Sequence, residues 1–450
     1  MSVAAPFDPQ TLETSLRELV PDYPNTRLCV AVSGGVDSMA LLHAAQTLAS
    51  AEPRVRLRAI HVDHGLQRDS RQWTAACRTQ CGTLGVSLQV LELRLQIAKG
   101  ESVEAEARRA RYAAIASALE PGECLLTAHH ADDQLETVLL QLFRGAGVAG
   151  LAAMPRAATL GKGLHLRPLL GVERVQLDAY ASTIGLTWVE DPMNRESRYD
   201  RAYLRHEVLP AIRRRWPAVA RTVGRSAGHF AAARGLLESL AEGDGVQLVD
   251  DSGRLEIAAL VALPRERQVN VLRWWIVRQG LGVPSAARLE SILRDVAAAR
   301  GDAQPLVTWP TGEVRRHRGR LHAMQPLGPL PPSTWRQDVG LGGTVELPCG
   351  LGRLTLALTR GEGLPVTALQ RRLTLGFLGS PAAEEAGPKH GLREVLRLAK
   401  VLPWMRERVP ITSDGNQVLG VAGHWIRRYP SPAAGEPTVR IVWQGGPPCI

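Results

Sequence analysis

Short apolar runs alternate with amphipathic stretches over residues 1–215. The runs at 28–32, 57–62, 87–93 and 124–128 have the length and the flanking turns of buried strands. Stretches with helical spacing follow them, at 38–49, 71–84, 103–119 and 132–143. Strands and helices that alternate in this way form a parallel sheet with helices on both faces, and ligands bind at the carboxyl ends of its strands. The pattern therefore predicts an α/β N-terminal domain with its site at that edge.

The pattern changes after residue 215. Helical spacing dominates residues 219–299, and a proline-rich segment at 327–332 is typical of a linker. Short strand-like runs and a basic helix at 392–400 then predict a small α/β C-terminal domain. A chain of 450 residues is too long for one hydrophobic core. We therefore predict three domains: residues 1–215, a helical middle domain at 216–326, and 333–450.

Composition narrows the class of protein. Hydrophobic residues make up 45% of the chain and charged residues 22%, which is ordinary for a soluble globular protein. The formal net charge of +10 favours a polyanionic partner, although a basic surface without a specific partner stays open. No apolar run reaches the ~20 residues of a membrane span, and residues 1–10 lack the pattern of a secretion signal. The six cysteines include no CxxC pair. We expect a cytoplasmic protein without a membrane partner, and no obligate protein partner is evident.

A glycine-bearing turn joins the first predicted strand to the first predicted helix, with the sequence Ser33-Gly34-Gly35-Val36-Asp37-Ser38. Glycines let the backbone turn tightly, and the following helix N-terminus offers free N–H groups to a phosphate. Asp37 suits such a site if a divalent cation lies between it and the phosphates. The turn lacks the lysine of the kinase and GTPase loop. A capped glycine turn without a ligand is the structural alternative.

Two further groups of polar residues fall near the same predicted edge. At helical spacing, Glu104, Arg108 and Arg111 share one face, although a solvated ion pair explains the same spacing. Carboxylates cluster where the fourth strand meets its helix, at Asp132, Asp133 and Glu136. They are candidate magnesium ligands opposite Asp37, but carboxylates at a helix start are also ordinary partners of its dipole. Just before them, His129 and His130 suit a metal or, as neutral imidazoles, a phosphoryl group or a base.

Gly145, Gly147 and Gly150 spell GxGxxG. The dinucleotide-binding fingerprint follows a strand and opens a helix, whereas this motif follows a predicted helix. We therefore interpret it as a bend that lets RNA or another chain segment approach closely.

Several stretches together resemble a known family. SGGxDS after a first strand is the signature of the N-type ATP pyrophosphatases, which cleave ATP between its α- and β-phosphates and transfer AMP to a carbonyl oxygen. Other stretches narrow the resemblance to the tRNA(Ile)-lysidine synthetase family: 61–66 (HVDHGL), 104–112 (EAEARRARY), 127–137 (TAHHADDQLET), 142–151 (LFRGAGVAGL) and 191–194 (DPMN). The resemblance is close over residues 1–215 and weak towards the C-terminus. It implies a PP-loop domain with the adenine-nucleotide α-hydrolase-like fold.

The resemblance also implies a reaction and its substrates. ATP adenylates the C2 carbonyl oxygen of the wobble cytidine in a tRNA(Ile) with a CAU anticodon, and the amine of free lysine then displaces AMP. It implies Mg²⁺ held by Asp37 and Asp133, and catalytic roles for these two and for Arg108 and His129. ATP would be bound by Ser33, Gly34, Gly35, Val36, Asp37, Ser38, His61 and Arg111. Lysine or tRNA would be bound by Glu104, Asp132, Glu136, Arg144, Asn194, Arg201 and Arg205, with Glu104 or one of Asp132, Asp133 and Glu136 on the lysine amine.

Nine arginines lie between residues 195 and 225, and we expect this stretch to meet the tRNA backbone; a solvated basic helix is the alternative. The chain departs from the family at 201–205, where the usual asparagine after the first arginine is absent, and at 373–379, which lacks a glycine-rich acidic stretch. Rival interpretations are a tRNA thiolase, which needs paired cysteines, a small-molecule amidating enzyme, which needs an ammonia source, and a non-catalytic tRNA-binding protein.

Overall fold

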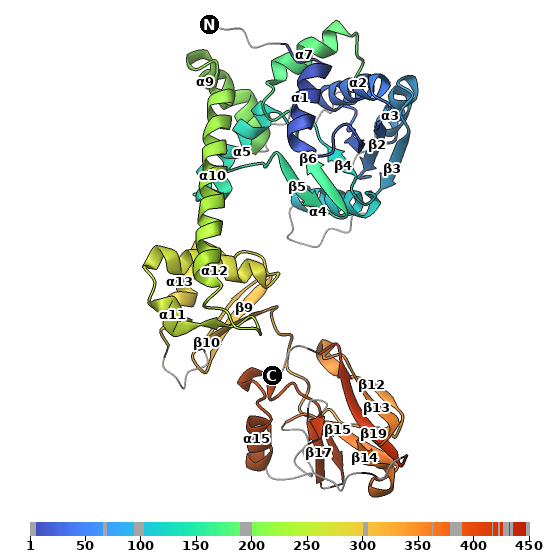
Figure 1. Cartoon of the computed structure of the whole chain (residues 1–450), viewed down its shortest axis with the longest axis vertical. Helices are drawn as coiled ribbons and strands as arrows, with labels where there is room; N and C mark the ends of the chain where they lie inside the picture. Colours follow the sequence, from blue (N-terminus) through green and yellow to red (C-terminus); the bar gives the residue numbers. More distant parts are fainter. Residues whose placement is uncertain are drawn as a thin grey trace. The chain divides into compact units, whose positions relative to one another are not determined.

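The computed structural model describes residues 6–65, 70–93, 103–189, 200–299, 305–361, 363–378, 389–415, 417–421, 424–425, 432 and 435–446. The chain divides into two compact units, Met1–Leu237 and Glu238–Ile450 (Figure 1). Among the described residues, no helix combines the length and the apolar character needed to cross a lipid bilayer.

The first unit is built on a six-stranded sheet in the order β3-β2-β1-β4-β6-β5. All neighbouring strands are parallel except the β5–β6 hairpin. The strands are β1 (Thr26–Ala31), β2 (Val55–Asp63), β3 (Leu88–Glu92), β4 (Cys124–Leu126), β5 (Ala157–Leu160) and β6 (Gly163–Leu166). The order reverses between β1 and β4, so the loops after these two strands part there and leave the crevice in which such sheets bind ligands.

Helices connect these strands, as the alternating pattern predicts. They are α1 (Pro9–Leu19), α2 (Val36–Ala51), α3 (Ser70–Thr83), α4 (Val103–Ala118), α5 (Ala131–Phe143), α6 (Val148–Leu151) and α7 (Arg174–Thr183). After them come α8 (Asp200–Tyr203), a π-helical turn (Leu204–Val208), α9 (Leu209–Arg215) and the long α10 (Val219–Gly245). The predicted α/β class is confirmed, while the β5–β6 hairpin and the short helices α6 and α8 are additions to it.

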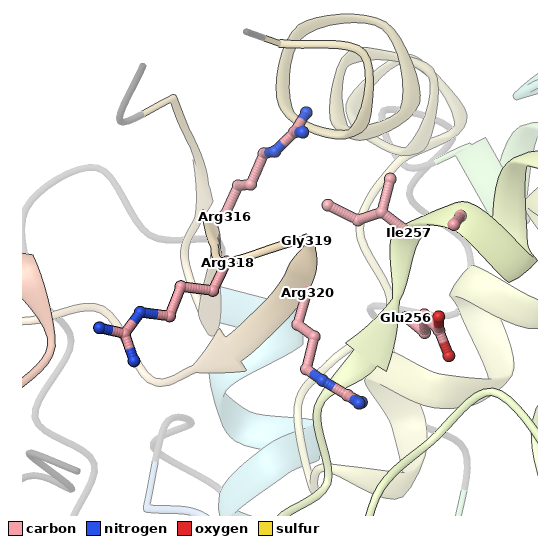
Figure 2. Close-up of a pocket in the computed structure, with 7 residues that line it drawn as sticks. Glu256, Ile257, Arg316, Arg318, Gly319 and Arg320 are labelled. Carbon is pink, nitrogen blue, oxygen red and sulfur yellow. The ribbon is translucent and has the colours of Figure 1, made fainter. Parts of the chain in front are cut away.

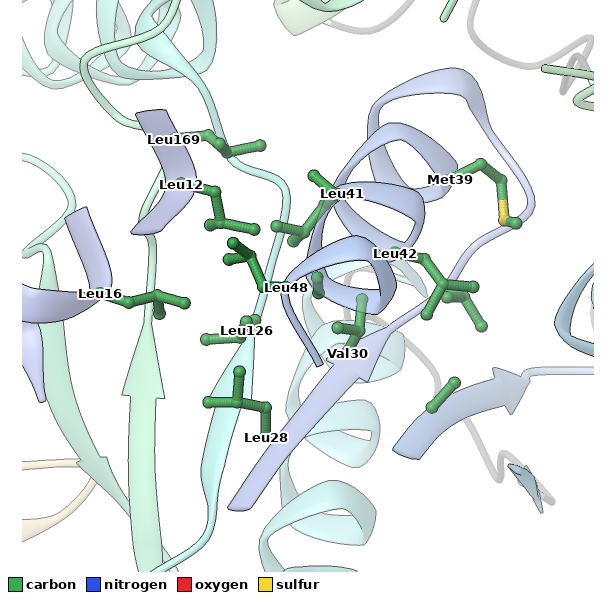
Figure 3. Close-up of a cluster of buried hydrophobic side chains, with 14 of the residues drawn as sticks. Leu12, Leu16, Leu28, Val30, Met39, Leu41, Leu42, Leu48, Leu126 and Leu169 are labelled. Atoms are coloured by element: carbon green, nitrogen blue, oxygen red, sulfur yellow. The ribbon is translucent and has the colours of Figure 1, made fainter. Parts of the chain in front are cut away.

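The core beside the first strand anchors the turn that follows it. On one face of the sheet, Leu28 and Val30 of β1 pack with Leu126 of β4 against Leu41 of α2 (Figure 3). The intervening Cys29 points to the other face, because side chains alternate along a strand, and packs there with Ile115 and Leu119 from the α4 region. Burying one such leucine is worth about 1.5–3 kcal/mol. The strand before the turn and the helix after it are therefore both fixed by the core.

The second unit contains the middle and C-terminal parts of the chain. Helices α11 (Ile257–Val261), α12 (Arg265–Arg278) and α13 (Ala286–Ser291) and a π-helical turn (Ile292–Ala297) share a core with an antiparallel sheet, β7-β10-β9-β8. Its strands are β7 (Leu255–Glu256), β8 (Leu306–Trp309), β9 (Gly312–His317) and β10 (Arg320–Met324). Helices are present as expected, but this sheet was not foreseen from the sequence.

Two antiparallel sheets and helix α15 (Lys389–Leu398) complete the second unit. One sheet has the order β11-β15-β16-β17-β18: Gln337–Gly340, Arg372–Gly376, Ile411–Asp414, Gln417–Val421 and His424–Trp425. The other has the order β12-β13-β19-β14: Thr344–Glu346, Arg353–Arg360, Pro437–Gln444 and Leu364–Pro365. The predicted linker, 327–332, forms neither helix nor strand.

Candidate active site

The glycine turn connects β1 to α2, which begins at Val36. Gly34 has a φ of +86°, a backbone conformation that favours glycine, and a Cβ there would lie 3.3 Å from Cys77 Sγ. The Ser38 hydroxyl accepts a hydrogen bond from the Ser33 amide at 3.1 Å and donates to the Gly35 carbonyl at 2.9 Å. These bonds hold the turn in shape. The N–H groups of the first turn of α2 have no acceptor within the helix, so they suit an anion.

His130 joins this turn to the start of α5. Its Nε2 lies 3.7 Å from Asp37 Oδ2 and 3.5 Å from Asp133 Oδ2. Its Nδ1 lies 3.5 Å from Asp132 Oδ2. Burial alone would lower the pKa of His130, but the contacts with Asp132 and Asp37 and the charge of Asp133 raise it to about 10. Asp37 and Asp133, from two different loops, therefore meet at one charged imidazolium, which is not the form of histidine that binds a metal.

Asp37 and Asp133 fit a magnesium ion that is shared with a nucleotide. The Oδ1 atom of Asp37 is buried and forms no hydrogen bond with any described group. Magnesium takes one or two carboxylates and completes its shell with phosphate oxygens and water. Within the described part of the chain, no group of three or more histidine, cysteine and acidic side chains could hold a metal ion by itself. The geometry thus suits a metal ion that binds together with phosphates.

The three acidic residues of α5, Asp132, Asp133 and Glu136, form what we call the carboxylate cluster. Glu136 is only 1% exposed and accepts hydrogen bonds from Arg201 Nε at 2.8 Å and Arg205 Nε at 2.7 Å. Asp133 Oδ1 lies 3.5 Å from Arg205 Nη2 and 3.8 Å from Arg201 Nη2. Burial raises the pKa of Asp133, but the charges of His130 and Arg201 outweigh it, so the pKa lies below its usual range. The cluster is balanced by arginines from a later segment of the chain.

Asp132 has a different set of partners. One oxygen forms an ion pair with Arg213 of α9, and the other accepts a hydrogen bond at 2.7 Å from the Arg174 amide, where α7 begins. Burial raises the pKa of Asp132, but His130 and this amide lower it to about 2. Asp132 thus joins three helices, α5, α7 and α9.

A second group of residues surrounds His129 and has no carboxylate of its own. We call Arg108, Arg111, His129, His165 and Arg167 the basic cluster. Burial is the largest cause that lowers the pKa of His129 to about 4 and that of His165 to about 3. Burial also lowers the pKa of Arg111 and Arg167, and no described carboxylate is close enough to oppose it. His129 is therefore neutral at physiological pH, whereas the adjacent His130 is charged.

Aromatic and imidazole rings link the members of the basic cluster. The Arg108 guanidinium lies 5.3 Å from the centre of the Tyr112 ring, which is 5.4 Å from the His165 ring. Arg111 donates a hydrogen bond from Nε to His64 Nε2 at 3.0 Å. These contacts bring α4 to the ends of β2 and β6. The shared face predicted for Arg108 and Arg111 therefore points to the same edge of the sheet as the glycine turn.

The remaining predicted site residues have separate positions. His61 is buried at the end of β2, where its Nδ1 donates to the Val32 carbonyl at 2.8 Å. Arg144 is exposed at the end of α5, 3.5 Å from Asp200. Glu104 belongs to α4, but its side chain lies outside the described residues, as does the whole of Asn194. Neither His61 nor Arg144 is in direct contact with the carboxylate cluster.

Sequence analysis gave no role to Thr127, His165 and Arg167, and it placed Arg213 among the arginines expected to meet tRNA, whereas the structure pairs Arg213 with Asp132. A signal for two of them was present: His165 and Arg167 alternate with Leu164 and Leu166, which predicts that both fall on one face of a strand. A histidine and an arginine inside an apolar strand pattern are unusual enough to mark a polar site.

A separate pocket of about 310 Å³ lies in the second unit, between the β7–α11 junction and the β9–β10 hairpin (Figure 2). Arg316, Arg318 and Arg320 line it, and Figure 2 shows their guanidinium groups diverging. Glu256 is the acidic residue that lines it. Arg320 lies 3.1 Å from Asp250, so part of this positive charge is already paired.

Three family models match this chain. A PP-loop domain model matches residues 9–212, a TilS substrate binding domain model matches residues 255–322, and a TilS substrate C-terminal domain model matches residues 382–443. The first match contains the glycine turn, both clusters and all but one of the arginines paired with the carboxylates. The second contains every residue that lines the arginine pocket.

Curated relatives match the chain over nearly its whole length. The tRNA(Ile)-lysidine synthase of Coxiella burnetii is 42% identical over 422 residues, which are 92% of this chain and 93% of the relative. The enzyme of the same name from Alkalilimnicola ehrlichii is 42% identical over 428 residues, or 93% of this chain and 94% of the relative. Among solved structures, a U34-tRNA thiolase from Methanococcus maripaludis is 18% identical with a TM-score of 0.41, covering 49% of this chain and 78% of that one.

Proposed function

Because the chain belongs to the tRNA(Ile)-lysidine synthase family, we propose that it joins free lysine to the wobble cytidine of tRNA(Ile) with a CAU anticodon and converts ATP to AMP and pyrophosphate. The use of ATP follows from its PP-loop domain. One observation supports the chemistry most directly: the turn after β1 and the carboxylates after β4 meet at His130. A nucleotide on the turn would then have its phosphates beside Asp37 and Asp133.

The proposed reaction has two steps. The cytidine C2 carbonyl oxygen attacks the α-phosphorus of ATP, and the bond from this phosphorus to pyrophosphate breaks. The lysine ε-amine, after losing a proton, attacks C2, and the bond from C2 to oxygen breaks as AMP leaves. Two steps are needed because a carbonyl oxygen is a poor leaving group and AMP is a good one. The free N–H groups of α2 would stabilise charge on the phosphates during the first step.

We assign the magnesium ion to Asp37 and Asp133. When bound, it would neutralise the charge that develops on the departing pyrophosphate. Arg108 and Arg111 would act on the same phosphates, since they carry positive charge that no described carboxylate balances. His61 would hold the start of the glycine turn through its hydrogen bond to the Val32 carbonyl.

The paired arginines suggest how free lysine is oriented. An amino acid carries both an ammonium and a carboxylate. The residues around Glu136 include arginines, which can pair with a carboxylate, and acidic side chains, which can pair with an ammonium. Arg201 and Arg205 are 35% and 27% exposed in their side chains, so each can accept a second partner. We propose that these arginines receive the lysine carboxylate while Asp133 receives an ammonium group. Glu136 is 1% exposed and both of its oxygens are bonded to the two arginines, so we assign it to holding them in place. The ε-amine needs a base near C2, and Glu104 stays a candidate for that role.

Asp132 is a second predicted lysine ligand that we reassign, for the same reason as Glu136. Both of its oxygens are engaged, one by Arg213 and one by the amide that begins α7. Binding an amine would require breaking an ion pair at a site that is 11% exposed in its side chain. We assign Asp132 to holding α5, α7 and α9 together.

The tRNA would be bound by arginines that the fold leaves exposed. Within the arginine-rich stretch, Arg201, Arg205 and Arg213 balance the carboxylate cluster, and Arg221 pairs with Glu173 at 2.8 Å. The exposed side chains of Arg214, Arg215 and Arg225 are better placed for phosphates. In the second unit, the pocket of Arg316, Arg318 and Arg320 offers a further site for the RNA backbone.

A tRNA thiolase is disfavoured by the cysteines. Burial raises the pKa of Cys77 to about 12 and that of Cys81 to about 11, so both stay protonated at physiological pH. A thiol that carries sulfur or binds an iron–sulfur cluster acts as the thiolate. These two cysteines instead pack in the core beneath the glycine turn.

The experiment that tests the proposal measures pyrophosphate release from ATP with a panel of amino acids, with and without tRNA(Ile) bearing a CAU anticodon. We expect release to require the tRNA and product formation to require lysine. Incorporation of sulfur in place of an amine would indicate a thiolase. Binding of the tRNA without any ATP turnover would indicate a non-catalytic protein.

A further inference from the structure

Four polar side chains form a continuous chain of hydrogen bonds: Arg167, His165, Thr127 and His129. Arg167 is 7% exposed, donates from Nη1 to the Pro155 carbonyl at 2.8 Å, and directs Nη2 to His165 Nδ1 at 3.2 Å. His165 Nε2 lies 2.9 Å from Thr127 Oγ1, which in turn lies 2.8 Å from His129 Nδ1.

The direction of each hydrogen bond follows from the arginine. A guanidinium is always charged in proteins and has no acceptor atom, so His165 Nδ1 must accept. The single ring proton of neutral His165 is then on Nε2, which donates to Thr127 Oγ1. Having accepted this bond, the Thr127 hydroxyl has one proton left to donate, and His129 Nδ1 is the acceptor in reach.

The opposite tautomer of His129 would break this order. With a proton on Nδ1, His129 and His165 would both donate to the Thr127 oxygen. The hydroxyl proton of Thr127 would then need a third partner, and the described residues provide none. A buried polar hydrogen without an acceptor costs about 1–3 kcal/mol.

We propose that Arg167, His165 and Thr127 are positioning residues that fix His129 as a hydrogen-bond donor from Nε2 toward a substrate oxygen. This inference rests on the proposed function. The acceptor would be a phosphoryl oxygen of ATP or the cytidine C2 oxygen, since negative charge develops on oxygens of this kind in both steps. His129 in this state cannot act as the base that deprotonates lysine, because its free nitrogen faces Thr127.

The electrostatic surroundings of His129 agree with a neutral ring. Arg108 of α4, Arg167 after β6 and Arg201 of α8 disfavour its protonation, whereas Asp133 of α5 favours it. Burial is the largest cause that lowers the pKa of His129 to about 4, and the three cations add to it. No described protein group accepts a hydrogen bond from Nε2, which leaves it available to a ligand.

The direct test is nitrogen NMR of the full-length protein labelled at histidine, with the two resonances assigned by His129→Gln and His165→Gln variants. We expect Nδ1 to be the unprotonated nitrogen in both rings, with no titration of either ring between about pH 5.5 and pH 8. A proton on Nδ1 of His129 would overturn the inference. This result does not depend on whether the enzyme acts on lysine, so it is separable from the proposed function.

Matched variants give the kinetic test. Thr127→Val removes the hydroxyl and Thr127→Ser keeps it; His165→Leu removes the donor and His165→Gln keeps an amide N–H in place of Nε2–H. We expect the Val and Leu variants to lose about 100-fold in rate, and the Ser and Gln variants to stay within about 5-fold of wild type, because a wrong tautomer is catalytically costly. The melting temperature serves as the control for folding. Equal rates for Thr127→Val and Thr127→Ser, with an unchanged His129 nitrogen spectrum, would refute a positioning role for Thr127.

The two reaction steps identify the acceptor. Exchange of labelled pyrophosphate into ATP follows adenylation alone, and lysine incorporation in a single turnover follows both steps. A defect of Thr127→Val in exchange would assign the acceptor to the ATP phosphate, and a defect confined to lysine transfer would assign it to the C2 oxygen. A normal rate in both assays would overturn the inference.

Discussion

Two groups of charged side chains share one edge of the first sheet, and they balance their charges in opposite ways. In the carboxylate cluster, the acidic residues of α5 are paired with His130 and with Arg201, Arg205 and Arg213. In the basic cluster, Arg111 and Arg167 have no described carboxylate, and both histidines are neutral. The first group is complete without a ligand, whereas the second gains a counterion only when an anion binds.

This difference predicts different responses to mutation. Removing one partner of a buried ion pair leaves an uncompensated charge and destabilises the fold strongly. Removing a buried cation that has no partner relieves an unfavourable burial instead. Variants of the carboxylate cluster should therefore lose stability, while variants of the basic cluster should lose activity with little change in stability. Asp37 is a special case, because its carboxylate faces His130 and also has a free oxygen.

The largest effect is expected for Asp37→Asn. The amide keeps the size of the side chain but cannot hold a cation with charge, so pyrophosphate release should fall by about 1000-fold, or roughly 4 kcal/mol in activation free energy. The melting temperature should fall only modestly, because Asp37 Oδ1 has no partner to lose and Oδ2 lies 3.7 Å from His130, beyond hydrogen-bond distance. Asp178→Asn is the control, since Asp178 is an exposed carboxylate on α7, 3.9 Å from Arg174. A wild-type rate for Asp37→Asn would contradict the magnesium assignment.

The next largest effect is expected for Glu136→Gln. Arg201 and Arg205 would lose their charged partner, and we expect the free energy of unfolding to fall by about 3 kcal/mol. Glu13→Gln breaks an exposed pair with Arg17 on α1, and should cost below about 0.5 kcal/mol. Urea denaturation of both variants measures the difference. Equal losses would show that the carboxylate cluster is not held by its arginines.

A pH experiment sharpens the contrast for His165. Its folded-state pKa of about 3 lies below the ordinary value of about 6.5, so the unfolded chain binds a proton first as the pH falls. The contribution of His165 is therefore fully present above pH 6.5 and is lost on acidification. From pH 7 to pH 4.5, wild type should lose about 2–3 kcal/mol relative to His165→Gln. Parallel stability curves for the two proteins would contradict a neutral, buried His165.

The smallest change in stability is expected for Arg111→Met. This substitution removes an unpaired cation, so the free energy of unfolding should stay within about 1 kcal/mol of wild type, while the dissociation constant for ATP rises by about 10-fold. The loss in affinity should shrink at high salt. Arg109→Met on the same helix is the control, because Arg109 pairs with Glu106 at 2.6 Å. Identical ATP affinities for the two variants would argue against a role of the basic cluster in nucleotide binding.

Much of the first unit could be predicted because its signals are local. Apolar runs and helical spacing give β1 to β4 and α2 to α5 within a few residues. The rule for parallel sheets then places the turn after β1 near the residues after β4. The meeting of Asp37 and Asp133 at one imidazolium is the outcome that this rule predicts.

The rest depends on contacts between distant residues. No local pattern shows that Glu136 and Asp132 are paired with Arg201 and Arg213, 65 and 81 positions away. The strands β7 to β10 are short, and they come together through backbone pairing and a shared core around Trp275. The β5–β6 hairpin turns at Gly161 and Gly163, where a Cβ would strike the backbone of preceding segments. Glycine is needed there for lack of space, and a hydrophobic pattern does not reveal such a requirement.

The ion pair between Asp132 and Arg213 determines where the chain can be cut to produce the first unit alone. The matched PP-loop region ends at residue 212, one position before this arginine. A fragment cut at that boundary would keep Asp132 but discard its arginine partner, and would leave His130 as the remaining described cation beside this carboxylate. A soluble, crystallisable version of the first half should therefore extend past Trp216, to where α9 is complete.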